Sequence, residues 1–300
     1  MDFSSGKALA ELCASENITI SEAMIRRETE LFGTSRAEVT AKMKKALSVM
    51  RESIGEAKRG NVDVLGGYIG GECRDYLGYI RHCKAIGGMI SRASAYAMGV
   101  IEVNASMGRI VAAPTAGSSG VLAGVLVAAG EEYGFTDDEL ISALWNAAAI
   151  GYLISRNATI AGAEGGCQAE VGAASAMAAS ALCELFGGTP EVCLSAAGDA
   201  ISNILGLVCD PIGGLVEAPC QKRNAMGVAN AVVSAEIALA TRHTLVPFDE
   251  VVKAMKQVGR SMPYQLRETA LGGLATAKNV AKKSNCDGCL KCDVSLFDMM

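Results

Sequence analysis

The chain has 300 residues, of which 50% are hydrophobic, so it can bury a sizeable core and is not intrinsically disordered. Its net charge of −5 and pI near 5.3 argue against a nucleic-acid partner, because phosphate binding requires clustered Lys and Arg. Only 5% of residues are aromatic, and the apolar residues are mainly Ala, Val, Ile, Leu and Met, which favours close-packed helices over a β-sandwich. We therefore predict an all-α protein with a single large helical domain over residues 1–280.

The cysteine content and the first residues bear on the surroundings of the protein. Eleven cysteines would suit a disulfide-rich secreted chain, but the opening MDFSSGKALAELC contains no apolar signal-peptide core. We expect a reducing, cytoplasmic environment in which thiols can bind metal or react. Mean hydropathy is +0.28, yet the longest uncharged runs are broken by Pro114 (residues 110–130) or are shorter than the roughly 20 residues that span a bilayer (residues 140–155). No membrane association is expected.

The first 60 residues are the most charged part of the chain and predict surface helices. Ser35 with Glu38 forms a capping-box pattern at the start of the longest one. Within it, apolar residues recur at helical spacing while Lys and Arg occupy the other face. Three helices are expected, at residues 4–15, 21–32 and 35–59.

The middle of the chain contains two glycine-rich loops. The first covers residues 64–71 and precedes a mostly helical stretch, residues 75–107, with a break at Gly87 and Gly88. The second, RIVAAPTAGSSG at residues 109–120, opens an apolar helix. A helix N-terminus offers unpaired N–H groups and a partial positive charge, so this loop could bind a phosphate or carboxylate. It is not a Walker loop, because no Lys follows at the required position.

The remaining helices have recognisable starts. Thr136 with Glu139 caps one that is expected to run to about residue 156, and Thr189-Pro190-Glu191 begins another that ends near residue 206. The other helices are expected at residues 121–132, 168–186, 224–242 and 247–259.

Three loops, at residues 115–120, 163–167 and 209–224, lead into the N-termini of apolar helices. If these N-termini converge, they form a positive, partly dry pocket that lowers thiolate pKa values and suits an anionic cluster or a substrate carboxylate. Two of the loops contain the cysteines that we consider as iron–sulfur ligands, namely Cys167, Cys209 and Cys220. The alternative is that the glycines mark close helix packing and the cysteines are small buried hydrophobes, since widely spaced cysteines are a weak metal pattern.

Three segments resemble the alpha subunit of the iron–sulfur-dependent L-serine dehydratase family. They are APTAGSSG (residues 113–120), AEGGCQAEVGAASAMAA (163–179) and CDPIGGLVEAPCQKRNA (209–225). The resemblance covers roughly residues 60–280 and implies an all-helical catalytic domain. It also implies a [4Fe-4S] cluster held by Cys167, Cys209 and Cys220, with the fourth iron open to substrate.

The resemblance also implies a reaction. Converting L-serine to pyruvate and ammonia requires removal of a weakly acidic Cα proton and expulsion of hydroxide. An open iron is a Lewis acid that can bind the substrate hydroxyl and carboxylate and stabilise both developing charges. The released aminoacrylate tautomerises to an imine that hydrolyses to the products, so no pyridoxal phosphate is needed.

Roles for individual residues follow from matching the same motifs. The substrate carboxylate or amino group would be held by Thr115, Gly117, Ser118 and Ser119. The residues beside Cys220 would neutralise the carboxylate or tune the cluster, and they are Lys222, Arg223 and Asn224. Glu164 would orient the ammonium. Alternatively, Arg223 only pairs with a surface acid and Ser118 only caps the helix that it opens.

The general base is not evident in this chain. Its two histidines, His82 and His243, lie outside any motif that we recognise. In the family a Ser-His-Thr motif lies in the beta part, and that tripeptide does not occur here. We therefore expect a separate beta subunit as partner and little activity from this chain alone.

The last residues, 281–300, form a cysteine-rich tail that departs from the family pattern. Cys286, Cys289 and Cys292 form a C-x-x-C-x-x-C array, which resembles part of a ferredoxin-type ligand set. A second metal site is one interpretation. The others are a tail cysteine that folds back onto the open iron, a small zinc site, or a redox-active thiol set.

Two other classes of function compete with an oxygen-sensitive L-serine ammonia-lyase. A related lyase acting on cysteine or threonine would keep the cluster and change the pocket. A non-catalytic iron–sulfur carrier or redox sensor would need a fully ligated cluster and no substrate loop. The segments TAGSSG and QKRN favour a lyase.

Overall fold

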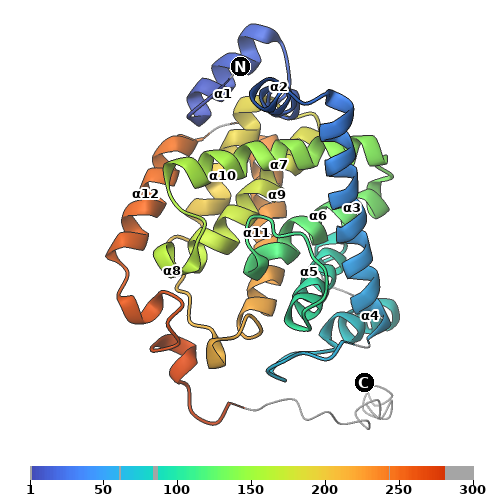
Figure 1. The fold of residues 1–300 in the computed structure, drawn as a ribbon, viewed down its shortest axis with the longest axis vertical. Coiled ribbons are helices and arrows are strands. Elements are labelled where there is room, and N and C mark those ends of the chain that lie inside the picture. The colour runs from blue at the N-terminus through green and yellow to red at the C-terminus, as the bar shows by residue number, and fades with distance from the viewer. Residues whose placement is uncertain (1, 61, 84–86, 243, 281–300) are drawn as a thin grey trace.

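The computed structural model describes residues 2–60, 62–83, 87–242 and 244–280, and these residues form helices with no β-strand among them (Figure 1). The all-α prediction is confirmed. The α-helices are α1 (Gly6–Glu16), α2 (Ile20–Phe32), α3 (Arg36–Arg59), α4 (Glu72–His82), α5 (Met89–Ala105), α6 (Ser119–Tyr133), α7 (Asp137–Asn157), α8 (Gly162–Gly165), α9 (Ala173–Leu185), α10 (Pro190–Ser202), α11 (Cys220–Thr241) and α12 (Phe248–Ser261). The short turns are η1 (Ala116–Ser118), η2 (Gln168–Gly172), η3 (Ile212–Gly214), η4 (Tyr264–Leu266) and η5 (Gly273–Thr276).

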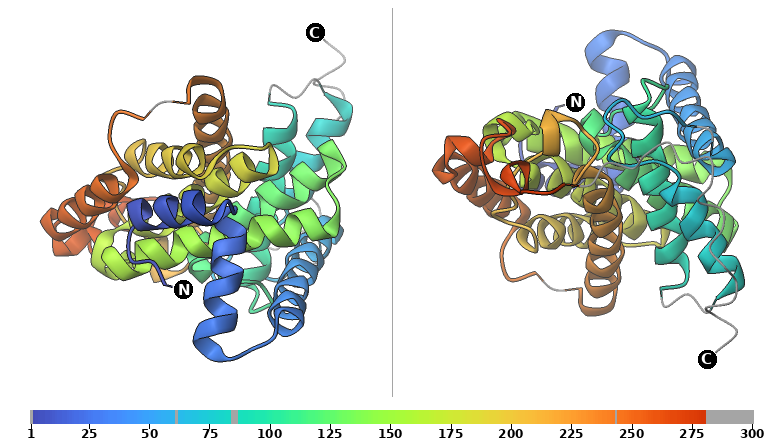
Figure 2. Two further views of the ribbon diagram at one scale, coloured as in Figure 1. Left: turned by 90° about the horizontal axis from the view of Figure 1, so that it is seen from above. Right: turned by 90° about the horizontal axis from the view of Figure 1, so that it is seen from below.

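The N-terminal helices begin close to their predicted positions because local capping determines their starts. Ser35 accepts a hydrogen bond from the Glu38 backbone N–H, and the Glu38 carboxylate accepts from the Ser35 N–H, so the predicted capping box of α3 is present. These helices are amphipathic, and α2 packs across α7 while α3 packs along α5 (Figure 2). The predicted surface helices therefore each bury one face against the core.

The centre of the molecule is a bundle of small-residue helices. Helices α5, α6, α7, α9, α10 and α11 pack on one another and contain most of the buried hydrophobic residues. Glycines allow close crossings within it. A Cβ built on Gly124 of α6 would lie 2.5 Å from the carbonyl oxygen of Ala93 on α5, and a Cβ on Gly120 would clash with the carbonyl of Ala97. Side chains this small let the helix backbones approach closely.

The predicted break within residues 75–107 is confirmed, since α4 and α5 are separate helices and Gly88, just before α5, has a φ of 51° and a ψ of −123°. Two element boundaries differ from the sequence prediction. Helix α10 ends at Ser202, since the Gly206 N–H bonds to the Gln168 side chain instead of extending the helix. Helix α11 begins at Cys220 rather than near Asn224, because the Gln221 and Arg223 N–H groups already make helical bonds.

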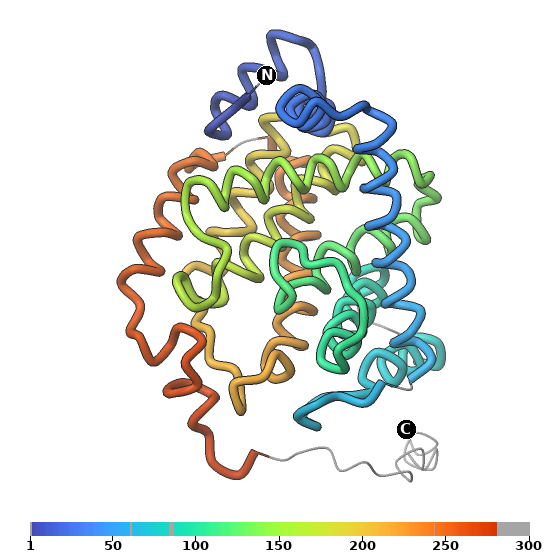
Figure 3. The backbone as a smooth tube through the Cα atoms, in the orientation of Figure 1, coloured from blue at the N-terminus to red at the C-terminus, as the bar shows by residue number. Residues whose placement is uncertain are grey.

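The arrangement places the loop segments at one end of the bundle. Helices α3 and α12 run along opposite sides of the molecule (Figure 1). The α10–α11 connection runs beside the segment that follows α12 (Figure 3), and the Cys209 N–H donates to the Leu266 carbonyl at 2.9 Å. None of the helices in the described ranges combines the length and apolar character needed to cross a bilayer.

Candidate active site

Cys167 lies at a tightly held turn between α8 and η2. The preceding Gly166 has a φ of 74°, and a Cβ there would lie 2.8 Å from the Leu207 carbonyl oxygen. The following Gln168 is fully buried and uses its side chain twice, accepting from the Gly206 N–H at 2.8 Å and donating to the Met255 carbonyl at 3.0 Å. These bonds tie the Cys167 turn to the α10–α11 connection and to α12.

Cys209 and Cys220 lie at opposite ends of the glycine-rich part of the α10–α11 connection. Cys209 is 3% exposed, and its carbonyl accepts from the Glu268 N–H at 2.7 Å. Cys220 is half-buried and is the first residue of α11. The electrostatic influence of Cys167 reaches both of these thiols, and Cys220 also influences Cys209. The structure therefore brings together the three cysteines that the motifs singled out.

Burial changes the acidity expected for these thiols. Desolvation raises the pKa of Cys167 to about 11, although the Arg223 guanidinium beside it acts in the opposite direction. Burial likewise raises the pKa of Cys220 to about 12 and that of Cys209 well above its ordinary value. The expectation that helix N-termini lower these pKa values is wrong, because desolvation of a thiolate outweighs a partial charge.

The three cysteines supply the type of donor that iron–sulfur clusters take. No group of three His, Cys, Asp or Glu side chains within the described ranges is arranged to hold one metal ion. A [4Fe-4S] cluster bonds each thiolate to a different iron, so its ligands surround a volume rather than meet at a point. The two loops present three free thiols, each buried or half-buried.

Arg223 links the two cysteine loops. Its Nη2 lies 2.8 Å from Oδ1 of the buried Asp210, its Nη1 donates to the Val208 carbonyl at 2.8 Å, and the side chain also hydrogen-bonds Cys167. Its partner acid is therefore a buried residue of the site and not a surface one. The neighbouring Lys222 is exposed.

Asn224 joins the 115–120 loop to α11. Its side chain is fully buried, accepts from the Gly120 N–H at 3.0 Å and donates to the carbonyls of Gly117 at 2.8 Å and Cys220 at 2.9 Å. These bonds occupy the amide, so Asn224 positions the backbone of both segments. Its predicted contact with substrate or cluster stays a prediction.

The hydroxyls of the 115–120 loop bond mostly within the loop. Ser118 and Ser119 are fully buried, and Ser119 Oγ donates to the Ala116 carbonyl at 2.8 Å. Ser118 Oγ lies 3.0 Å from Thr115 Oγ1. Thr115 is half-buried, and its hydroxyl also bonds to a residue outside the loop. It donates at 2.8 Å to Glu170 Oε1.

Glu170 is the site residue that sequence reasoning missed. It lies in η2, a single π-helical turn, and its Oε2 is 3.8 Å from Cys209 Sγ. Burial raises its pKa, the Thr115 hydrogen bond lowers it, and the charge of Glu268 raises it. A charged residue in the otherwise small and apolar stretch QAEVGAASAMAA is the pattern that could have drawn attention to it. Glu164, predicted to orient the ammonium, is exposed on α8.

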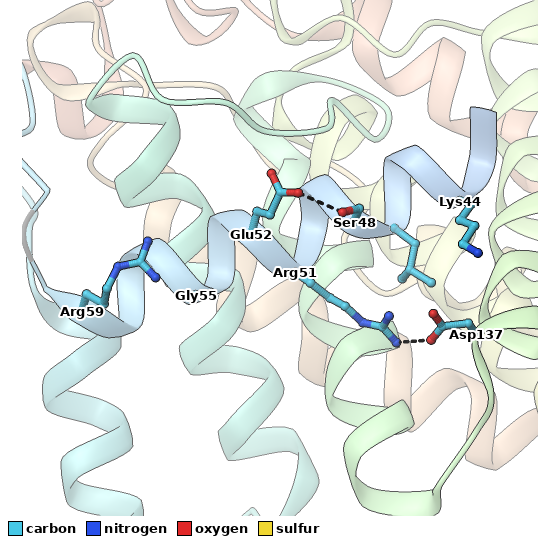
Figure 4. Close-up of a pocket in the computed structure, with 8 residues that line it drawn as sticks. Lys44, Ser48, Arg51, Glu52, Gly55, Arg59 and Asp137 are labelled. Carbon is cyan, nitrogen blue, oxygen red and sulfur yellow. Dashed lines mark hydrogen bonds and ion pairs between the residues drawn. The ribbon is translucent and has the colours of Figure 1, made fainter. Parts of the chain in front are cut away.

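Several predicted features lie away from this site or outside the described ranges. His82 is exposed at the C-terminal end of α4, while His243 and the tail residues Cys286, Cys289 and Cys292 lie outside the described residues. A surface groove between α3 and the start of α7 contains an exposed Arg51–Asp137 ion pair of 2.7 Å (Figure 4). Solvated pairs of this kind contribute little, and the cysteines do not line this groove.

Comparison with known proteins agrees with the motifs. The family model described as "Serine dehydratase alpha chain" matches residues 15–275. The "Probable L-serine dehydratase, alpha chain" of Bacillus subtilis (strain 168) is 44% identical over 285 residues, covering 94% of this chain and 95% of that protein. The "L-serine dehydratase, alpha chain" of Peptoniphilus asaccharolyticus is 46% identical over 277 residues, covering 92% and 95%. The "L-serine dehydratase" of Helicobacter pylori (strain J99) is 36% identical and covers 91% of this chain but only 61% of that protein. The chain belongs to the serine dehydratase alpha chain family.

Proposed function

We propose that this chain is the cluster-bearing alpha chain of an L-serine dehydratase that converts L-serine to pyruvate and ammonia. The observation that carries the proposal is the meeting of Cys167, Cys209 and Cys220 beside the 115–120 loop. The three thiols interact electrostatically, and Thr115 reaches the same site through Glu170. We infer L-serine as the substrate from the names of the alpha-chain relatives.

Cys167, Cys209 and Cys220 would hold the [4Fe-4S] cluster. When bound, it supplies a Lewis acid for departure of the serine hydroxyl. The raised thiol pKa values mean that cluster binding displaces protons from these side chains. Arg223 is placed to offset negative charge at Cys167 and is itself anchored by Asp210.

The remaining residues of the site bind and orient the substrate. The first turns of η1 and α6 present a partial positive charge that favours the substrate carboxylate. Asn224 holds these turns against α11, so the carboxylate site keeps a fixed position relative to Cys220. A fixed orientation of Cα and hydroxyl is what an elimination requires.

A separate beta chain completes this proposal. The Helicobacter pylori relative extends well beyond the region matched here, whereas the alpha-chain relatives do not. Within the described part of the chain the one histidine, His82, is exposed on α4. We therefore assign removal of the Cα proton to a group of the beta chain.

The Cys167→Ser variant tests the cluster. After anaerobic reconstitution we expect it to lose most of the iron and the cluster absorbance of the wild-type chain, because a hydroxyl is a poor ligand for iron–sulfur clusters. Cys183→Ala is the matched control, since Cys183 is also fully buried but donates to the Ala235 carbonyl in the core. Equal iron content in the wild type and Cys167→Ser would refute the ligand assignment.

Substrate addition tests the reaction. L-Serine, L-threonine and L-cysteine are added separately to the cluster-loaded chain assembled with its beta partner, and keto-acid release and the cluster spectrum are followed. Pyruvate release with serine preferred supports the proposal. Preference for another amino acid indicates a related lyase, and a spectrum indifferent to all three indicates a carrier or sensor.

A further inference from the structure

Helix α11 exposes an apolar face along most of its length. Its buried residues pack against α5, α6, α9 and α10. On the outer side, Met226, Val233 and Ile237 are 36%, 43% and 49% exposed. At 3.6 residues per turn they fall within about one third of the helix circumference, together with half-buried Ala229 and exposed Ala240. The C-terminal end of this helix lies at an outer edge of the molecule in both views of Figure 2.

The apolar surface continues beside the C-terminal half of α11. A groove of about 440 Å³ lies there between α11 and the ends of α6 and α9, and Glu236 is the one charged residue among the described residues that line it. Tyr133 and Phe186 also line the groove, and their exposed rings make an edge-to-face contact at 5.1 Å. A stable interface covers about 800 Å² per partner, and the groove adds apolar area to the face of α11. Continuous apolar surface of this kind is typical of a protein–protein contact.

The two charged residues on this face are placed symmetrically about its centre. Lys222 and Glu236 are both exposed and lie seven residues to either side of Ala229. At a rise of 1.5 Å per residue, each is about 10 Å from Ala229 along the helix axis. Their charges have opposite signs, so the pair adds no net charge to the face, although the whole chain carries −5.

We propose that this face of α11 binds a second copy of the chain, with the two α11 helices antiparallel and crossing at Ala229. A two-fold axis at this point places Lys222 of each copy opposite Glu236 of the other, and Met226 opposite Val233. A parallel pair would instead place each charge opposite its own kind, which is unfavourable. The small side chain of Ala229 lets the helices approach at the crossing. Neither the cluster nor the substrate takes part, so the contact is independent of the proposed function.

The mass of the full-length chain in solution tests the contact. Sedimentation equilibrium of the wild-type chain without its beta partner should give twice the chain mass of 30.9 kDa. We expect Val233→Arg to weaken the dimer at least about 100-fold, because it places a charged side chain of each copy in the apolar centre of the contact. Leu31→Arg, at another exposed apolar position on α2, is the matched control and should stay dimeric. Circular dichroism of each variant checks that it folds.

Charge reversal tests the antiparallel arrangement. Lys222→Glu and Glu236→Lys should each weaken the dimer about 10-fold, because each turns two attractive pairs into repulsive ones. The double variant restores opposite signs and should return to within about threefold of the wild-type dissociation constant. Glu236→Gln only removes an exposed pair and should change that constant less than about threefold. Lys45→Glu, an exposed change on α3, is the control for charge reversal.

Each other outcome overturns the proposal. A dimer that is insensitive to Val233→Arg uses a different face. A double variant that is weaker than either single reversal excludes the antiparallel pairing of Lys222 with Glu236. If the wild-type chain is monomeric and Val233→Arg instead prevents binding of the beta chain, the face belongs to the beta chain and not to a second copy.

Discussion

Glu102 is a second buried carboxylate and lies near the start of α11. Its side chain is fully buried, and Oε1 accepts from the Cys73 N–H and from Gln221 Nε2, each at 2.9 Å. The same Gln221 nitrogen donates to Glu72 Oε2 at 3.1 Å. Burial raises the pKa of Glu102 to about 7, the Cys73 N–H opposes this, and the charge of Glu72 adds to it. The folded chain therefore favours the protonated form of Glu102.

This raised pKa predicts a pH-dependent stability. Because the folded pKa lies above the ordinary value of 4.5, the contribution of Glu102 is fully present below about pH 4.5 and is lost as the pH rises through about 7. The loss amounts to about 3 kcal/mol of unfolding free energy. Glu102→Gln stays neutral, so its stability relative to wild type should increase from acidic to mildly alkaline pH, measured by urea unfolding. Exposed Glu236→Gln serves as control. Parallel pH profiles of wild type and Glu102→Gln would contradict the prediction.

At the scale of elements, the α5–α6 crossing positions the 115–120 loop. Helix α6 begins directly after η1, so any shift of α6 against α5 moves Thr115 and its bond to Glu170. The close crossing depends on the lack of a side chain at Gly124, because this residue lies against the Ala93 carbonyl and the Ala97 N–H of α5. Packing between buried helices is intolerant of added volume.

Two alanine substitutions distinguish close packing from helix propensity. Gly124→Ala places a Cβ 2.5 Å from the Ala93 oxygen and should lower the unfolding free energy by about 1–3 kcal/mol. Gly78→Ala in α4 meets no atom within 4 Å and should raise it by about 0.5–1 kcal/mol, because alanine favours the helix. Urea unfolding of both variants measures the difference. A neutral or stabilising effect of Gly124→Ala would show that α5 and α6 can separate freely.

At the scale of the whole molecule, the site is assembled from segments far apart in the chain. The loop before α6, the turn before η2 and the α10–α11 connection meet because α6, α9 and α11 pack against one another. Cluster binding would add a further link between segments that helix packing and the side-chain bonds of Gln168, Arg223 and Asn224 already join. Catalysis additionally requires a proton acceptor, which we assign to the beta chain.

This assignment predicts the behaviour of the separate chains. The cluster-loaded alpha chain alone should release pyruvate from serine at least about 100-fold more slowly than the assembled protein, because a positioned general base typically contributes 10²–10⁴-fold. Pyruvate formation before and after addition of the beta chain measures this. A mixture containing the Cys167→Ser chain controls for turnover by the beta chain. Full activity of the alpha chain alone would show that its own residues supply the base.

Local patterns predicted the elements better than the site. The capping boxes at Ser35 and Thr136 identify the starts of α3 and α7 because both partners lie within four residues of each other. The sequence predicts the start of α11 too late, because the polar residues after Cys220 resemble a loop. In the structure, the Asn224 side chain bonds to the Cys220 carbonyl and to the 115–120 loop, and the helix already begins at Cys220. Glu164 and Glu170 cannot be ranked from sequence, because each directly follows an alanine and each lies three residues from Cys167.

The sequence by itself determined the helical class, the caps and, through three motifs, the family and its cysteines, because these depend on composition and on neighbours in the chain. Only the tertiary structure decided which carboxylate enters the site and how acidic the thiols are. Glu170 reaches Thr115 and Cys209 through the π-helical turn, and burial raises the pKa of Cys167 despite the nearby Arg223. Desolvation and contact between distant segments arise only when the helices pack.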